Sequence, residues 1–153
     1  MKKIIIGDVK IPEHNWILDH FEGDFIWFYT DHAIIGHPYG CTIRNVISSL
    51  IHHDIVEIYV IGLNKNSHHI TNEMLEEYYQ KEQISIDSRK TLEYIFVQTQ
   101  GCSLTDWIQG LPLKEDNIRE SVKLLKHHPI IPNRVKVTGY LAKENEKRII
   151  QIV

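Results

Sequence analysis

The chain reads IYVIGLNKN over residues 58–66, an apolar run that ends at Gly62 and continues into a polar stretch. An apolar segment of this kind is typical of a buried strand in a parallel sheet. In open α/β folds, the residues that carry chemistry gather at the carboxyl ends of such strands. The residues that follow Gly62 are therefore expected at the functional edge of a sheet.

The segments around this strand predict an α/β protein. Residues 25–29 (FIWFY) are apolar on both sides, which favours an interior position in the sheet or an interface. Thr42 is a natural N-cap for a helix over residues 43–51, whose apolar residues keep helical spacing. The other predicted elements are strands over residues 3–6, 57–61, 135–141 and 149–153, and helices over residues 13–21, 72–81, 88–99, 103–108 and 118–127. Strands that alternate with helices indicate a parallel sheet, and the last two strands indicate a hairpin.

Composition and charge exclude several classes of protein. Of 153 residues, 42% are hydrophobic and 24% charged, which is ordinary for a globular domain. A formal net charge of −3 provides no basic field to attract nucleic acid or an acidic membrane surface. No segment approaches membrane-spanning length, and Cys41 and Cys102 lie far apart in a pattern that suits reduced thiols. We therefore expect a cytoplasmic protein, with no membrane insertion and no nucleic-acid partner.

Three segments carry a resemblance to a known family. Residues 120–152 read ESVKLLKHHPIIPNRVKVTGYLAKENEKRIIQI, residues 22–25 read EGDF and residues 45–61 read NVISSLIHHDIVEIYVI. In order and spacing they resemble the β-class carbonic anhydrases. The resemblance implies a single domain over residues 1–153, with a four-stranded parallel sheet, an antiparallel C-terminal strand and helices on both faces. It also implies a homodimer or a higher homo-oligomer.

The resemblance also implies where a zinc site would lie. In the family the third strand ends in Gly-His-x-x-Cys, which supplies two zinc ligands, and here Leu63 stands for the histidine and Asn66 for the cysteine. The first strand of the family ends in Cys-x-Asp-x-Arg, which supplies the third ligand and a catalytic dyad. Here Ile6 stands for the cysteine, Asp8 keeps the aspartate, and Lys10 stands for the arginine.

These replacements bear directly on zinc chemistry. Zinc requires thiolate, imidazole or carboxylate ligands, and the side chains of Ile6 and Leu63 have no electron pair to donate. Without the metal, a water molecule does not become hydroxide at neutral pH. We therefore expect no cofactor, and a pseudoenzyme with a binding, assembly or regulatory role.

Other polar residues are candidates for a binding site. Asp8 and Lys10 are interpreted either as a remnant dyad that contacts an anion or a polar ligand, or as part of a strand-end turn in which Asp8 caps local backbone. Asp31 and His32 are expected at the same rim. The free N–H groups before the helix that carries Thr42 and Arg44 would bind a small anion such as bicarbonate.

A relocated metal site is the alternative. Asp31, His32, His37 and Cys41 lie on one loop, and three of them could hold zinc, although their spacing matches no standard zinc motif. With such a site the protein would be an active carbonate dehydratase, which converts CO2 to bicarbonate, or another lyase. The two alternatives differ in whether the protein binds stoichiometric metal.

Overall fold

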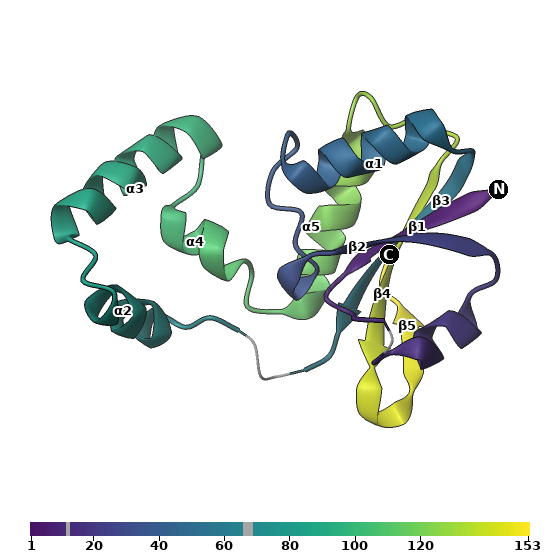
Figure 1. Cartoon of the computed structure of the whole chain (residues 1–153), viewed down its shortest axis with the longest axis horizontal. Coiled ribbons are helices and arrows are strands. Elements are labelled where there is room, and N and C mark those ends of the chain that lie inside the picture. The colour runs from purple at the N-terminus through teal and green to yellow at the C-terminus, as the bar shows by residue number, and fades with distance from the viewer. Residues whose placement is uncertain (12, 66–68) are drawn as a thin grey trace. The chain divides into compact units, whose positions relative to one another are not determined.

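The computed structural model describes residues 1–11, 13–65 and 69–153. They group into two compact units, which we describe separately: unit 1 comprises Met1–Asn66 and Leu113–Val153, and unit 2 comprises Ser67–Pro112. The expectation of a single domain stays a prediction. Asn66, one of the expected ligand positions, lies outside the described residues. In unit 1 the elements are β1 (Lys2–Gly7), η1 (Asn15–His20), β2 (Asp24–Tyr29), η2 (Asp31–Ala33), α1 (Cys41–His52), β3 (Ile55–Leu63), α5 (Lys114–His127), β4 (Lys136–Lys143), η3 (Glu144–Glu146) and β5 (Arg148–Gln151) (Figure 1).

Unit 1 is built on a five-stranded sheet with the order β2-β1-β3-β4-β5. The first four of these strands are parallel to their neighbours, and β5 runs antiparallel to β4. The predicted α/β fold is therefore confirmed. The predicted interior position of residues 25–29 is wrong, because β2 is an edge strand. Its two apolar faces are explained by the two cores of the unit, since Phe28 packs against one and Trp27 against the other.

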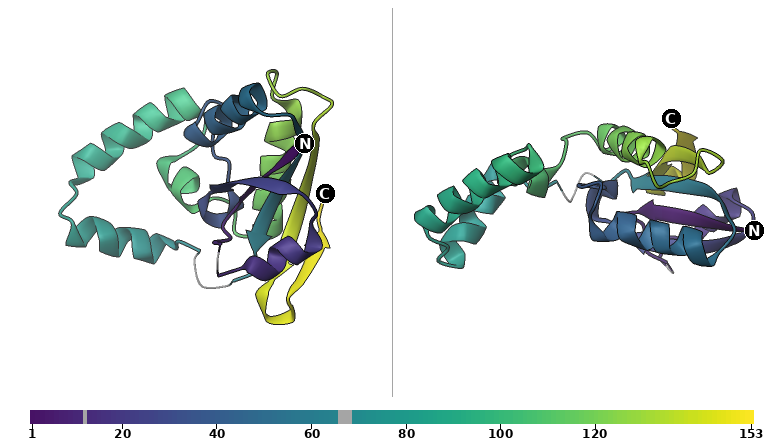
Figure 2. Two further views of the ribbon diagram at one scale, coloured as in Figure 1. Left: turned by 45° about the vertical axis from the view of Figure 1, so that its right-hand side comes forward. Right: turned by 90° about the horizontal axis from the view of Figure 1, so that it is seen from above.

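The sheet separates two apolar cores. The helix-side core joins strand residues such as Ile4 and Val60 to α1 and α5, which lie on the same side of the sheet (Figures 1 and 2). The aromatic-side core joins Ile5 and Ile61 to η1 on the opposite face, where several aromatic rings pack together. The side chains of a strand alternate between these two cores, so neighbouring residues of β1 or β3 contribute to different ones.

Two helices of unit 1 begin at residues that the sequence did not predict. The N-cap of α1 is Gly40, which places Thr42 inside the first turn instead of at the cap. The last helix, α5, begins at Lys114, ahead of the predicted start at Ile118. Glu115 and Asp116 occupy its first turn, where negative charge stabilises a helix N-terminus. This extra turn carries α5 over the carboxyl edge of the sheet.

Unit 2 consists of α2 (Asn72–Lys81), α3 (Ile86–Gln100) and α4 (Leu104–Gln109). The side chains of Thr71, Ser85 and Ser103 cap the three helices by accepting a hydrogen bond from the first turn. Among the apolar side chains described in this unit, Leu75 is buried, whereas α3 has no buried residue. The helices exist as predicted, and their packing leaves many apolar side chains exposed.

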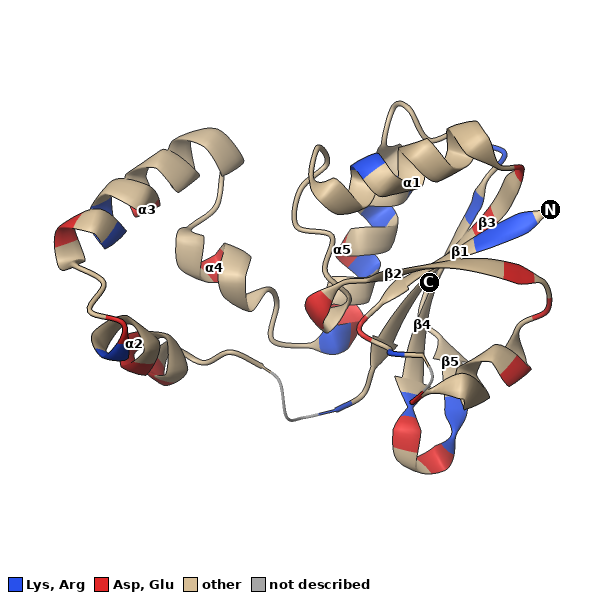
Figure 3. Ribbon diagram, in the orientation of Figure 1, with Lys and Arg blue, Asp and Glu red and all other residues tan. Residues whose placement is uncertain are grey.

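Charges of both signs are interspersed along both units (Figure 3). The hairpin between β4 and β5 illustrates this, since Lys143 pairs with Glu146 across the turn. In the part of the chain that the structure describes, no helix is both long enough and apolar enough to cross a membrane.

Candidate functional site

Two glycines shape the carboxyl edge of the sheet. A Cβ atom on Gly7 would lie 1.9 Å from the carbonyl oxygen of Ile61, so only glycine allows β1 and β3 to approach this closely at their ends. A Cβ atom on Gly62 would lie 2.8 Å from the Cγ atom of Lys114, whose side chain passes over the strand. The glycines therefore make room for a polar cluster between β1, β3 and the start of α5.

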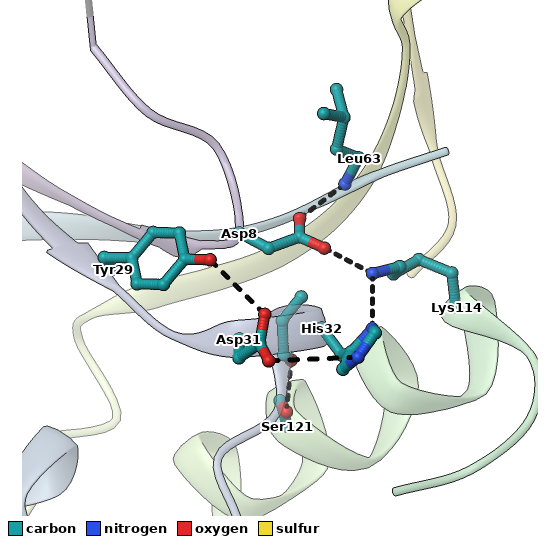
Figure 4. Close-up of polar contacts among 8 residues, drawn as sticks. Asp8, Tyr29, Asp31, His32, Leu63, Lys114 and Ser121 are labelled. Carbon is teal, nitrogen blue, oxygen red and sulfur yellow. Dashed lines mark hydrogen bonds and ion pairs between the residues drawn. The ribbon is translucent and has the colours of Figure 1, made fainter. Parts of the chain in front are cut away.

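Asp8 is the centre of this cluster (Figure 4). Its Oδ1 atom accepts a hydrogen bond of 2.6 Å from the backbone N–H of Leu63, and its Oδ2 atom accepts one from the ammonium group of Lys114. The side chains of Asp8 and Lys114 are only 10% and 13% exposed. Hydrogen bonds between charged groups are about twice as strong as neutral ones, and burial protects this pair from solvent. The pair ties β1, β3 and α5 together.

His32 extends the cluster towards the loop after β2. The ammonium group of Lys114 lies 3.3 Å from the Nδ1 atom of His32 and has only protons to donate, so Nδ1 accepts. The proton of the neutral ring is then on Nε2, which lies 3.9 Å from Oδ2 of Asp31 (Figure 4). The hydroxyl of Tyr29 donates to Oδ1 of Asp31. Burial raises the pKa of Tyr29, and the carboxylate of Asp31 raises it further.

The loop that carries His32 has an unusual backbone. His32 and Ala33 both have positive φ angles, 52° and 57°, a conformation that is unfavourable for residues other than glycine. Ser121 of α5 holds the loop in place, since its buried hydroxyl donates to the carbonyl of Ala33 and accepts from the N–H of Ile35. Strain of this kind persists where the surroundings enforce it, and it is typical of functional sites.

The side chains at two expected ligand positions lie in the apolar cores. Ile6 is fully buried in the helix-side core, and Leu63 is buried in the aromatic-side core on the opposite face of the sheet. Figure 4 shows the side chain of Leu63 pointing away from the carboxylate of Asp8. These two residues neither face one another nor present a donor atom, and the cation beside Asp8 is the ammonium of Lys114. The residues found here do not fit a zinc ion.

Lys10 does not form the expected dyad with Asp8. Its ammonium group lies 5.5 Å from the centre of the Tyr29 ring, and its side chain is exposed. The partner of Asp8 is Lys114 instead. The structure thus separates Lys10 from Asp8, and a binding role for either residue stays a prediction.

The loop residues considered for a relocated metal separate in the structure. His32 is buried in the Asp8 cluster and Asp31 lies at its exposed rim, whereas Nδ1 of His37 accepts a hydrogen bond from the N–H of Tyr39 and Cys41 is exposed. Within residues 1–11, 13–65 and 69–153, no three His, Cys, Asp or Glu side chains form a group that could hold a metal ion.

The residues expected to bind an anion lie on α1, whereas the polar cluster around Asp8 lies between β1, β3 and the start of α5. Thr42 and Arg44 belong to the first turn of α1, and the side chain of Arg44 is exposed. The N–H of Arg44 is used in the helix, where it donates to the carbonyl of Gly40. Anion binding at this turn stays a prediction.

Sequence reasoning missed Lys114 and Ser121. Both lie on α5, one at its first residue and the other two turns later, with Ile118 between them on the same face. The available signal was the acidic pair Glu115 and Asp116, which is typical of a first helical turn and would have moved the predicted start of α5 back to Lys114.

Comparisons with known proteins agree with the fold and the resemblance. No family model matches the chain. A carbonic anhydrase-like protein of Bacillus subtilis, YbcF, is 32% identical over 111 residues, which span 70% of this chain and 59% of YbcF. YtiB of the same organism, named as a carbonic anhydrase, is 24% identical over 127 residues, or 79% of this chain and 63% of YtiB. The chain thus matches less than two thirds of the length of either relative.

The fold matches solved carbonic anhydrases over almost the entire chain. The β-carbonic anhydrase isoform I of Trichomonas vaginalis superposes with a TM-score of 0.75 at 16% identity, covering 99% of this chain and 81% of that one. A carbonic anhydrase of Streptococcus mutans gives a TM-score of 0.66 with the same coverage and 17% identity. Together with the sequence relatives, these matches show that the chain belongs to the β-class carbonic anhydrase-like family.

Proposed function

We propose that this protein has lost the zinc site of its family, does not hydrate CO2, and acts as a binding, assembly or regulatory protein. The proposal is supported above all by the apolar side chains of Ile6 and Leu63, which stand at two ligand positions and are buried in the cores of unit 1. A ligand lost from an exposed pocket could be replaced by a neighbouring side chain. Restoring a ligand here would place a polar group in an apolar core, which is unfavourable.

The polar cluster supports a binding role. Asp8, Lys114 and His32 lie at the carboxyl edge of the sheet, where α/β proteins bind their ligands. The charges of Asp8 and Lys114 neutralise one another, so the cluster presents hydrogen-bonding groups and little net charge. A small polar molecule with hydrogen-bond donors is a chemically suitable ligand for the exposed rim that Asp31 forms, whereas the carboxylate of Asp31 disfavours an anion such as bicarbonate there.

CO2 hydration tests this proposal directly. The protein is expressed with zinc supplied, purified without chelators, and assayed by stopped-flow with a pH indicator. We expect no rate above buffer and less than about a tenth of an equivalent of zinc per chain, because zinc-bound hydroxide is the nucleophile of the family reaction. An active carbonic anhydrase assayed under the same conditions is the control. A hydration rate that rises with protein concentration, together with near-stoichiometric zinc, would refute the proposal and favour the relocated metal site.

We also propose that the protein is a homodimer and that unit 2 contacts the second copy. The support is the apolar surface of α3, where Leu92, Tyr94, Ile95 and Val97 are each at least 45% exposed. Exposed apolar surface of this extent usually marks an interaction site. Unit 1 offers a separate candidate surface, because the outer edge of β2 pairs with no other strand among the described residues.

Light scattering after size-exclusion chromatography tests the dimer. The wild-type chain is expected at twice its monomer mass of 18.0 kDa. Ile95→Glu should shift the equilibrium towards monomer, because it puts a charge into an apolar interface. Gln98→Glu is the matched control, since it adds the same charge to an exposed position of the same helix. A wild-type monomer at all concentrations, or equal effects of both variants, would contradict the proposed contact.

A further inference from the structure

We propose that the start of β4 is a docking edge for an extended segment of another protein, in which aliphatic residues alternate with acidic ones. The site consists of the outer edge of residues 136–138 and the groove beside it, between β4 and the end of α5. It lies at the amino end of β4, whereas the polar cluster of Asp8 lies at the carboxyl edge of the sheet. The inference therefore concerns a surface that the proposed function does not use.

The first support is a free stretch of sheet edge. β5 pairs with β4 only over residues 140–143, and one residue further the N–H of Gly139 donates to the carbonyl of Val153. Alternate residues of a strand direct their backbone groups to the same side, so the N–H and carbonyl of Val137 point to this outer edge as well. In the described part of the chain, no strand pairs with residues 136–138 on that side. Unpaired backbone of this kind is what an added strand binds.

The second support is the groove beside this edge. Its volume is about 430 Å³, and its lining includes Leu125, Ile131, Val135 and Val137, each at most 6% exposed. Ligand pockets in proteins have volumes of about 300–1,000 Å³. The side chain of Val137 belongs to the helix-side core, so a strand added next to it would direct every second side chain into the groove. These side chains should be aliphatic.

The third support is charge. Lys126 and Lys136 line the groove, and none of the described residues that line it has a carboxylate side chain. Lys136 is 70% exposed, and its Nζ atom lies 3.9 Å from Oε1 of Glu57, a carboxylate that Lys3 approaches more closely, at 2.9 Å. Because Lys136 and Val137 are neighbours on a strand, their side chains point to opposite faces. The positions of the added strand that alternate with the aliphatic ones would therefore face Lys136, and acidic residues suit them.

The same charges disfavour a second copy of this chain as the occupant. Two copies paired through this edge would present identical surfaces to one another and bring the Lys136 side chains of both close together. Like charges placed against one another destabilise a contact, and lysine on an edge strand is a common means of preventing identical edges from pairing. An acidic segment of a different protein meets no such repulsion.

Selection from a random library tests the proposal without a known partner. A phage-displayed library of random heptapeptides is panned against the immobilised protein, and the selected sequences are compared with those from a blank surface. We expect enrichment of peptides in which Val, Ile or Leu alternates with Asp or Glu. Enrichment of no sequence over the blank surface, or of basic sequences only, would overturn the proposal.

Charge reversal then tests the location. An enriched peptide, labelled with fluorescein, is titrated with the wild type and with the double variant Lys126→Glu and Lys136→Glu, and binding is followed by fluorescence anisotropy. Both lysines are exposed, so the variant should keep the melting temperature of the wild type. Its affinity should be about 10-fold lower or less, because attraction becomes repulsion at two positions.

The double variant Lys81→Glu and Lys123→Glu is the matched control. It makes the same change in net charge at side chains that are 81% and 67% exposed and lie outside the groove. The control should bind the peptide as the wild type does. Equal affinities of the groove variant and the wild type, or an equal loss in the control, would contradict the proposed location.

Amide exchange measured by NMR distinguishes strand pairing from attraction between charges alone. The N–H of Val137 should exchange more slowly when the peptide is bound, because it donates to the added strand. A version of the peptide with N-methyl groups at alternate residues should lose most of its affinity, since it lacks the donors for the edge. Unchanged exchange at Val137, or full affinity of the N-methylated peptide, would overturn the pairing.

These outcomes are distinguishable from those of the proposed function. Failure of peptide binding would leave the silent-enzyme proposal standing, and activity in the hydration assay would not affect the docking edge. Light scattering covers the other occupant. If Lys126→Glu and Lys136→Glu changed the mass of the protein in solution, a second copy would occupy the edge and the proposal would be wrong.

Discussion

Two lysine–carboxylate pairs lie at opposite ends of the same two strands. At the amino end, Lys3 of β1 and Glu57 of β3 are register partners, with 2.9 Å between Nζ and Oε2, and their side chains are 22% and 23% exposed. At the carboxyl end, Asp8 pairs with Lys114, and these side chains are 10% and 13% exposed. The first pair joins neighbouring strands, whereas the second joins a strand end to a helix that is distant in the sequence.

The surroundings of the two pairs differ more than their chemistry. The hydroxyl of Tyr59 donates to Glu57 and accepts from Lys3, so the amino-end pair has a third partner that can redistribute its hydrogen bonds. The pKa of Glu57 is lowered by its hydrogen bonds to Tyr59 and Lys3. The carboxyl-end pair is more buried and carries the loop of His32. Similar ion pairs on one sheet can therefore have different roles. The amino-end pair stabilises two neighbouring strands near solvent, whereas the carboxyl-end pair belongs to the candidate site.

The largest expected effect separates the two lysines. Lys114→Met should lower the free energy of unfolding by about 3 kcal/mol or more, because it leaves a buried carboxylate unpaired. Lys3→Met should lower it by only about 0.5 kcal/mol, as is usual for a pair near solvent. Urea unfolding followed by circular dichroism measures both. Equal losses in the two variants would show that burial does not distinguish the pairs.

Gly62→Ala is expected to have an intermediate effect. The new Cβ atom would meet the stem of Lys114 and the Cδ1 atom of Ile118, each at 2.8 Å, and overpacking of this kind costs about 1–3 kcal/mol. Part of the loss should disappear in a background of Lys114→Ala, where the stem is gone. Additive losses in the double variant would mean that the glycine and the lysine act independently.

The smallest expected effect concerns the amino-end cluster at alkaline pH. Burial raises the pKa of Tyr59 to about 12, and its hydrogen bond to Glu57 contributes. A group whose pKa is raised in the folded state stabilises the protein below its unfolded pKa, near 10, and that stabilisation is lost as the pH rises towards 12. At pH 11 the contribution is about 1 kcal/mol.

Tyr59→Phe should therefore flatten the fall in stability between pH 10 and 12. Urea unfolding at several pH values measures this, with Tyr39→Phe as the control because Tyr39 is 77% exposed. Absorbance at alkaline pH should also show a tyrosine that ionises late in the wild type and is missing from Tyr59→Phe. If Tyr59→Phe left the pH dependence of stability unchanged, ionisation of Tyr59 would not be a cause of the fall in stability at alkaline pH.

The sequence by itself determined the elements and much of the site. Apolar runs and helical spacing predicted the strands and helices, because these patterns depend on neighbours a few residues apart. The resemblance to the β-class carbonic anhydrases singled out Ile6, Leu63 and Asp8, since each aligns with a residue of the family's motifs at the end of a strand. For residues 25–29 the sequence left an interior position and an interface open, because two apolar faces do not distinguish a central strand from an edge strand that contacts two cores.

Only the tertiary structure decided which cation accompanies Asp8. Lys10 is close in the sequence, but Lys114, 106 positions away, makes the contact. The contact depends on where α5 begins, on the absence of a side chain at Gly62, and on the order of the strands that brings β1 beside β3. Ser121 was hidden for the same reason, since its hydroxyl matters only once α5 lies against the loop of His32. Local patterns specify elements, whereas a site at the edge of a sheet is specified by which elements meet there.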